Sequence, residues 1–172
     1  MYWFEVRCIE QKINIYGGTK MDDRLFRNAM GKFATGVTVI TTKADDVVHG
    51  MTANAFMSVS LDPKLVVISI GHKARMLEKI TAAKRFVVNI LSNEQKDLSM
   101  HFAGQVKDDL TIDFETINDM PVIKDSLSNI VCNVKASYVE GDHTLFIGEV
   151  TDIILNDGEP LTYFEGKYGK LI

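Results

Sequence analysis

Three segments of the chain carry apolar residues at the 3.6-residue period of an amphipathic helix. The first is residues 22–33, and Asp22 is expected to cap its N-terminus. The second is residues 73–83. The third follows a Ser-x-x-Gln capping box that begins at Ser92, and it is expected to end near Gly104. The pattern therefore predicts three short helices.

Most other apolar residues lie in short β-branched or alternating runs, which are typical of strands. The continuous run at 65–70 is expected to be buried on both faces of a sheet. Residues 130–138 alternate and predict one apolar face. That face would carry Ile130, Cys132, Val134, Ala136 and Tyr138. Further strands are expected at 37–42, 86–91, 144–155 and 161–164, with a weaker one ending near Val59.

The order of these elements favours one fold class. The strands follow one another closely and only short helices separate them, so a long alternation of strand and helix is missing. This predicts a mainly β domain, a mostly antiparallel barrel with peripheral helices. Residues 105–128 are expected to form an irregular excursion on its surface.

The N-terminal segment, residues 1–20, differs from the rest in composition and precedes the helix pattern that starts at Met21. It is expected to be an extension outside the core, with residues 21–172 as the domain. An additional leading strand is the alternative.

Composition and charge narrow the class of function. The net charge is −4, so no basic face is indicated and a nucleic acid is not an expected partner. No apolar run is long enough to span a membrane. Cys8 and Cys132 lie far apart and form no C-x-x-C pair. A reduced cytoplasmic protein with two unreactive thiols is the expectation.

Common catalytic motifs are absent from the sequence. It contains no G-x-G-x-x-G, no P-loop and no G-x-S-x-G. Its four histidines stand at no spacing typical of metal ligands, so a metal site is not expected.

Three stretches could still form a binding site. A polar row at Thr52, Asn54, Ser58 and Ser60 would lie on one face of a strand, where it could hold a flat, hydrogen-bonding ring or simply face solvent. The sequence GHKAR at 71–75 could hold an anion at a helix N-terminus, or be an ordinary solvated helix start.

The third stretch is the turn Gly141-Asp142-His143, which precedes a strand interrupted by Gly148. A glycine inside a strand often marks the close approach of a ligand or of another backbone. His143 and Gly148 could thus frame a planar ligand, although a single histidine in a turn is more often only solvated.

Five stretches in this order resemble one family. They are FATGVTVITT (33–42), GMTANAFMSVSLDPKLVVISI (50–70), FVVNILSNEQKDLSMHFAG (86–104), GDHTLFIGEV (141–150) and YFEGKYGKL (163–171). The chain resembles the short flavin reductases with the FMN-binding split-barrel fold, from about Phe26 to Leu171. These include reductase components of two-component flavin-dependent monooxygenases, such as 4-hydroxyphenylacetate 3-monooxygenase.

The resemblance implies where cofactors bind. His143 matches the histidine associated with nicotinamide nucleotide binding. The other matching positions would contact the flavin ring, its ribityl chain or its phosphate. They are Thr35, Gly36, Met51, Thr52, Ala53, Asn54, Ser58, Ser60, His72, Lys73, Ala74, Arg75, Phe102, Ala103, Gly104 and Tyr168. The turn His72–Arg75 departs from the family because it lacks a hydroxyl residue, and cationic side chains could replace that contact.

The implied activity is hydride transfer from NADH or NADPH to FMN, with FAD possible, in a homodimer with its flavin sites at the subunit interface. Reduced flavin would pass to a partner monooxygenase. Two alternatives remain from the sequence. One is a flavoprotein that carries electrons without being an enzyme, and the other is a vitamin B6-phosphate oxidase on a related barrel.

Overall fold

The computed structural model describes residues 22–106 and 110–171. The helical elements are α1 (Asp23–Met30), α2 (Met76–Ala83), η1 (Asn93–Gln95) and α3 (Lys96–Phe102). The strands are β1 (Thr35–Gly36), β2 (Thr38–Ala44), β3 (Val47–Ala53), β4 (Phe56–Leu61), β5 (Lys64–Gly71), β6 (Arg85–Ile90), β7 (Phe114–Ile117), β8 (Met120–Ile123), β9 (Ser128–Glu140), β10 (His143–Leu155), β11 (Thr162–Phe164) and β12 (Lys167–Gly169).

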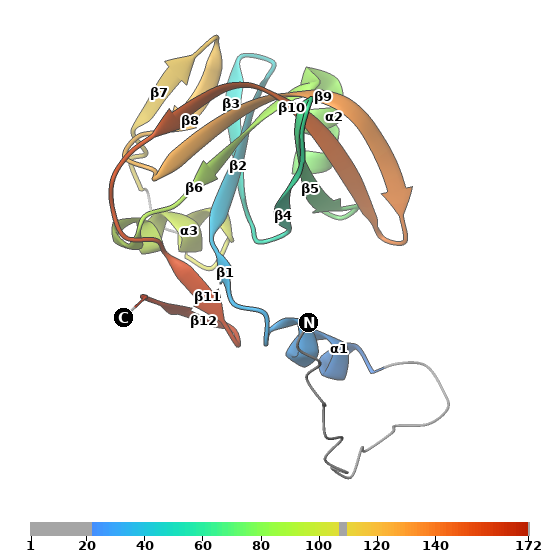
Figure 1. Cartoon of the computed structure of the whole chain (residues 1–172), viewed down its shortest axis with the longest axis vertical. Helices are drawn as coiled ribbons and strands as arrows, with labels where there is room; N and C mark the ends of the chain where they lie inside the picture. Colours follow the sequence, from blue (N-terminus) through green and yellow to red (C-terminus); the bar gives the residue numbers. More distant parts are fainter. Residues whose placement is uncertain (1–21, 107–109, 172) are drawn as a thin grey trace, which may run out of the picture.

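Seven strands form the main sheet, in the order β3-β2-β6-β9-β10-β5-β4, and every neighbouring pair is antiparallel. Its two edge strands are consecutive in the chain, because only Asn54 and Ala55 separate β3 from β4. The sheet therefore curls until its edges approach each other at that junction (Figure 1). No ladder joins β3 to β4 among the described residues, so the barrel stays split. The prediction of a mainly antiparallel β fold with peripheral helices is confirmed.

The interior of the barrel is a continuous apolar cluster. Fully buried members include Ile40, Ile68, Ile70, Phe86 and Val88, and α2 closes one side with Met76 and Ile80. Burying each side chain of this size contributes roughly 1.5–3 kcal/mol, so this cluster is the main source of stability.

Gly148 belongs to this interior and not to a ligand site. A Cβ at Gly148 would lie 2.5 Å from Cζ of Phe86 and 2.9 Å from Cβ of Cys132. The strand lacks a side chain here because the Phe86 ring occupies the space. The hypothesis that Gly148 and His143 frame a planar ligand is therefore wrong.

Two predictions about which residues of a strand share a face or are buried were wrong. The strand predicted at 65–70, within β5, is buried on one face only, because Val66, Ile68 and Ile70 point inward while the alternate residues are half-buried. In β9 the pairing shifts at Lys135, so that Val134 faces Gly148 but Ala136 faces Ile147. This β-bulge moves Ala136 and Tyr138 to the opposite face from Cys132.

The helix predictions hold with small shifts. Asp22 caps α1 by accepting a hydrogen bond from the Arg24 amide at 2.9 Å. The capping box at Ser92 forms, with the Ser92 amide donating to Oε1 of Gln95 at 3.1 Å. Helix α2 starts at Met76 rather than at residue 73, because residues 72–75 form a turn.

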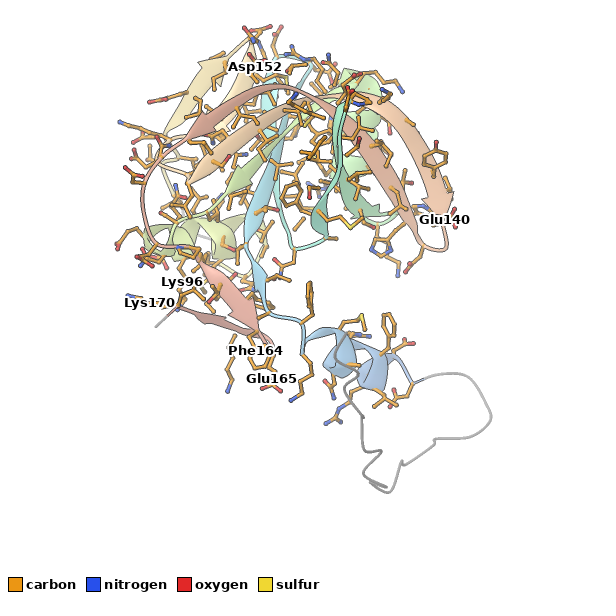
Figure 2. The ribbon with its side chains drawn as sticks, in the orientation of Figure 1. Lys96, Glu140, Asp152, Phe164, Glu165 and Lys170 are labelled. Atoms are coloured by element: carbon orange, nitrogen blue, oxygen red, sulfur yellow. The ribbon has the colours of Figure 1, made fainter. Side chains whose placement is uncertain are left out.

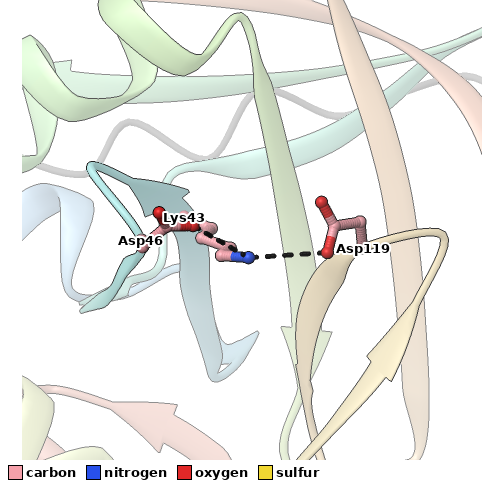
Figure 3. Close-up of polar contacts among 3 residues, drawn as sticks. All are labelled: Lys43, Asp46 and Asp119. Atoms are coloured by element: carbon pink, nitrogen blue, oxygen red, sulfur yellow. Dashed lines mark hydrogen bonds and ion pairs between the residues drawn. The ribbon is translucent and has the colours of Figure 1, made fainter.

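Residues 105–128 are more regular than expected. Strands β7 and β8 form a hairpin whose turn residues, Asn118 and Asp119, adopt positive φ angles of 47° and 67°. All four residues of β8 are buried against the barrel. Lys43 links the β2–β3 hairpin to this one, since its Nζ lies 3.4 Å from Asp46 and 3.5 Å from Asp119 (Figure 3).

The N-terminal part of the described chain lies outside the barrel. Residues 22–36, which we call the arm, carry α1 and β1 and extend away from the barrel (Figure 1). Helix α1 buries none of its residues in this chain, although its apolar stripe is as predicted. The short β11–β12 hairpin pairs with β1 and lies beside the arm.

Candidate functional site

A groove of about 840 Å³ opens where the arm, the β3–β4 junction and the outside of the barrel meet. The lining is mostly apolar, with a few polar groups. Its residues are Phe33, Ala34, Thr35, Gly36, Thr38, Asn54, Ala55, Phe56, Met57, Val67, Ser69, Ile90 and Leu145. A concave, mainly apolar hollow of this size is typical of sites for cofactor-sized ligands.

The two walls of the groove are the segments that continue beyond the end of the β2–β3 ladder. Strands β2 and β3 stay paired up to Thr38 and Ala53, where the Thr38 hydroxyl donates to the Ala53 carbonyl at 2.5 Å. Beyond this pair, the arm turns away to β11 and the other strand turns into β4. The groove occupies the space between the two departing segments.

Thr35, which lines the groove, has a hydroxyl without a hydrogen-bond partner among the described residues. The Oγ1 atom of this hydroxyl is buried. Leaving such a group unpaired costs about 1–3 kcal/mol. A mostly apolar lining that also carries polar residues such as Thr35 and Asn54 suits a flat ring with polar edges, so the residues present fit a flavin.

The polar row predicted from the sequence does not lie on one strand. The chain leaves the sheet at Asn54, so Thr52 belongs to β3 while Ser58 and Ser60 belong to β4. A second irregularity between Ser58 and Ser60 breaks their alternation. Asn54 alone of the row lines the groove. The one-face prediction was wrong because periodicity cannot reveal where a strand is broken.

Thr52 is held by helix α3. Its hydroxyl donates to the Ser99 carbonyl at 2.7 Å, which directs the side chain toward α3. Its neighbours Met51 and Ala53 pack against the barrel interior. Thr52 is not part of the groove lining.

His143 lies on the same outer face as the floor of the groove. The inward residues of β5 and β10 alternate with Ser69 and Leu145, which pair with each other and line the groove. Two residues further along, Gly71 pairs with His143. At about 3.3 Å per residue, His143 therefore stands roughly 7 Å beyond the floor.

The ring of His143 is oriented by its neighbours. Nδ1 lies 2.7 Å from Oδ1 of Asp142, and Nε2 lies over Gly71. The hydrogen bond from His143 lowers the pKa of Asp142, so the carboxylate keeps its charge and accepts from Nδ1. This leaves the Nε2 edge of a half-exposed ring for a ligand.

The basic turn His72–Arg75 lies at the same end of the barrel. The His72 amide donates to the Asp142 carbonyl at 2.9 Å, which ties this turn to the turn that carries His143. Nε2 of His72 is 3.3 Å from the Thr144 hydroxyl. Arg75 precedes the first turn of α2, and His72, Lys73 and Arg75 are exposed. The turn can therefore present positive charge beside the outer face.

The segment Phe102–Gly104 ends helix α3, as the sequence indicated. Phe102 packs over β3, where a Cβ at Gly50 would lie 2.3 Å from its ring. Ala103 and Gly104 are exposed, and Gly104 has a φ of 68°. Together with Met51, Ser58, Ser60 and Tyr168, these three residues are not part of the groove lining.

Sequence reasoning missed the apolar lining of the groove. Phe33, Phe56, Met57, Val67 and Leu145 come from four separate segments. Each reads as an ordinary core residue, and only the curl of the sheet brings them together. The exposure of Met57, which reaches 60%, distinguishes this surface from the core.

Two structural features are absent from the described part of the chain. No helix there is long and apolar enough to cross a membrane. No group of three or more histidine, cysteine, aspartate or glutamate side chains there is arranged to hold a metal ion.

The sequence and the fold of the chain resemble those of known proteins. Residues 30–171 match the family described as flavin reductase like domain. An NADH-dependent flavin reductase from a Rhodococcus species is 42% identical over 148 residues, which cover 84% of this chain and 84% of that protein. The reductase component of 4-hydroxyphenylacetate 3-monooxygenase from Thermus thermophilus is 35% identical, over 86% of this chain and 95% of that protein. The solved structure of flavin reductase PheA2 is 63% identical and superposes with a TM-score of 0.87, over 88% of this chain and 99% of that one. The chain belongs to the flavin reductase like domain family.

Proposed function

We propose that this protein is an NADH-dependent flavin reductase that transfers a hydride from the nicotinamide to FMN, with FAD as an alternative flavin. The observation that carries the proposal is the shared outer face, on which an apolar groove and an oriented histidine lie side by side. The relative from Rhodococcus, whose name specifies NADH, supports NADH over NADPH as the donor.

The residues of the groove would bind the flavin ring. Thr35 would donate or accept a hydrogen bond through its unpaired hydroxyl, and the exposed amide of Asn54 would contact a polar edge of the ring. Gly36 leaves open space for the ring, since a Cβ there would meet nothing within 4 Å. Ser58, Ser60 and the turn His72–Arg75 are proposed contacts of the ribityl chain and phosphate, and Phe102–Gly104 would border the site.

When bound, the flavin supplies the redox chemistry, accepting at N5 the hydride that leaves C4 of the nicotinamide. The protein's task is positional, since the reacting atoms must be held about 3–3.5 Å apart. The Nε2 edge of His143 would bind the nicotinamide nucleotide, and Asp142 would hold the ring in the required orientation. No side chain is required to transfer a proton in this step.

The exposed apolar surfaces support a homodimer. Phe26 and Met30 of the arm are each 56% exposed, and Phe33 is 78% exposed. The outer face of the barrel exposes Met57 and Tyr138 as well. Large apolar side chains that are exposed in this way are typical of an interface. A symmetric pair, in which the arm of each chain covers the outer face of the other, would bury both surfaces and border both grooves.

A partner monooxygenase would consume the reduced flavin, as the name of the Thermus relative indicates for that protein. A flavoprotein that only carries electrons is the alternative function. A cytoplasmic location stays a prediction from the sequence.

One experiment tests the activity. The purified protein is mixed with NADH and increasing FMN, and the nicotinamide absorbance is followed over time. Consumption of NADH that saturates with added flavin is the expected result, and repeats with FAD and NADPH identify the preferred pair. A protein that binds flavin but oxidises neither nicotinamide would instead be an electron carrier.

A further inference from the structure

The arm wall of the groove is held in place from outside the barrel. Thr35 and Gly36 pair with Tyr163 and Thr162 of β11 and not with the main sheet. At the tip of the β11–β12 hairpin, the Glu165 amide donates to the Gly31 carbonyl at 2.9 Å, and the Glu165 carboxylate pairs with Lys32. Figure 2 shows Glu165 and Phe164 at this tip, beside the arm. The hairpin therefore determines where the arm wall stands.

The hairpin is in turn fixed to helix α3. The Tyr168 hydroxyl lies 3.0 Å from Oγ of Ser99, which is completely buried. The Tyr163 and Tyr168 rings meet edge to face at 5.2 Å, and Nζ of Lys96 lies 5.8 Å from the centre of the Tyr168 ring. The polar end of Tyr168 thus points to α3 while its ring packs on the hairpin.

Ser99 also holds the opposite wall. Its carbonyl accepts the hydrogen bond from Thr52, two residues before Asn54 at the β3–β4 junction. Ser99 therefore connects the two walls. Its carbonyl is bonded to the β3–β4 side through Thr52, and its hydroxyl is bonded to the hairpin that holds the arm through Tyr168. The path runs from Asn54 to Thr52, Ser99 and Tyr168, and then through β11 to Thr35.

We propose that Tyr168 and Ser99 are positioning residues for the flavin groove, and that their hydrogen bond sets the separation of its two walls. This role rests on the proposed function, because the groove is taken to be the flavin site. Tyr168 then affects flavin binding without touching the flavin. A change in the wall separation would weaken contacts to the ring on both sides, whereas His143 stands on the outer face and would keep its position.

The test compares Tyr168→Phe, Ser99→Ala and the double variant with the wild-type protein. The dissociation constant of FMN is measured by fluorescence titration, and KM for FMN, KM for NADH, kcat and Tm are measured in parallel. Loss of one hydrogen bond is expected to raise the dissociation constant and KM for FMN about three- to tenfold. KM for NADH and kcat should change less than about twofold, because the mechanism places neither residue at the reacting atoms.

Tyr163→Phe is the matched control. It removes a hydroxyl from the same hairpin, and no hydrogen bond of that hydroxyl is present among the described residues. Its FMN affinity should equal that of the wild type. The double variant should bind FMN no worse than either single variant, because both changes remove the same interaction.

The outcomes separate the two proposals. A wild-type protein that binds no flavin and oxidises no NADH overturns the proposed function, and the positioning role fails with it. Normal FMN affinity in Tyr168→Phe, or a lower Tm without weaker flavin binding, overturns the positioning role alone. If Ser99→Ala does not fold, the comparison of Tyr168→Phe with Tyr163→Phe decides the question.

Discussion

The two faces of the barrel are built from the same strands but serve different purposes. In β5, Val66, Ile68 and Ile70 are buried inside, while Val67 and Ser69 line the groove outside. The inner face is closely packed around the Phe86 ring. The outer face leaves apolar side chains exposed, and the groove it borders holds an unpaired hydroxyl. The contrast separates buried residues that stabilise the fold from exposed residues that we propose bind a ligand or a second chain.

The largest effect is expected from adding one methyl group to the inner face. Gly148→Ala would place a Cβ 2.5 Å from the Phe86 ring, and such overpacking costs about 1–3 kcal/mol. Thermal unfolding should show a clearly lower Tm. Gly36→Ala is the matched control on the arm, where a Cβ meets nothing within 4 Å, and its Tm should stay close to that of the wild type. Equal Tm values for the two variants would show that the inner face is not tightly packed at Gly148.

The second prediction concerns the arm. If the protein is the proposed homodimer, replacing Phe26 and Met30 together by glutamate should convert it to a monomer without unfolding the barrel, because α1 buries none of its residues in its own chain. Light scattering after size-exclusion chromatography measures this as a fall from twice 19.3 kDa to that mass. Asn28→Glu adds charge to the polar side of the same helix and should leave the dimer intact. If the double variant remains a dimer, the arm is not the interface.

A smaller effect is expected at the end of the outer face. His143→Ala should raise KM for NADH about tenfold, the loss expected for one hydrogen bond to a charged group, with kcat little changed. Asp142→Asn should raise KM for NADH by a smaller factor, since it removes the carboxylate that orients the His143 ring. Steady-state kinetics with FMN saturating provide the measurement. A lower kcat at unchanged KM would instead place His143 in the chemical step.

The smallest effect is expected at Lys43, near the end of β2 that is opposite to Thr38 and the groove. Lys43→Ala should lower Tm by about 2 °C or less, because ion pairs with exposed partners contribute little. Hydrogen bonding to Asp46, and then the charge of Asp119, raise the pKa of Lys43 above its usual value of 10.5. The pair is therefore present at neutral pH and is lost as the pH rises through the raised pKa. A difference in Tm that persists above that pH, or in high salt, would argue against an ionic origin.

Local patterns predicted much of the fold. The alternating and β-branched runs indicated most strands, and Asp22 and Ser92 marked helix starts that the structure confirms. These predictions succeed because caps and periodicity depend on residues close together in the chain. The hairpin β7–β8 was missed, although Asn118-Asp119 between two short apolar runs is a turn signal.

The site was predicted less completely. The resemblance pointed to Thr35, Gly36 and Asn54, which line the groove. Tyr168 was expected to contact a cofactor, yet its hydroxyl bonds to Ser99. No local signal distinguishes a tyrosine that contacts a ligand from one that supports the wall beside it, because the difference lies in which distant residue it meets.

By itself, the sequence determined the mainly β class, the succession of most strands along the chain, the apolar stripe of α1 and the set of residue types available for binding. Only the tertiary structure decided which residues face outward. The bulge at Lys135 moves Tyr138 to the outer face, the Phe86 ring requires glycine at 148, and the break at Asn54 separates Thr52 from Ser58. Each of these depends on contacts between segments far apart in the chain, and a shift of one residue in a strand reverses every side chain beyond it.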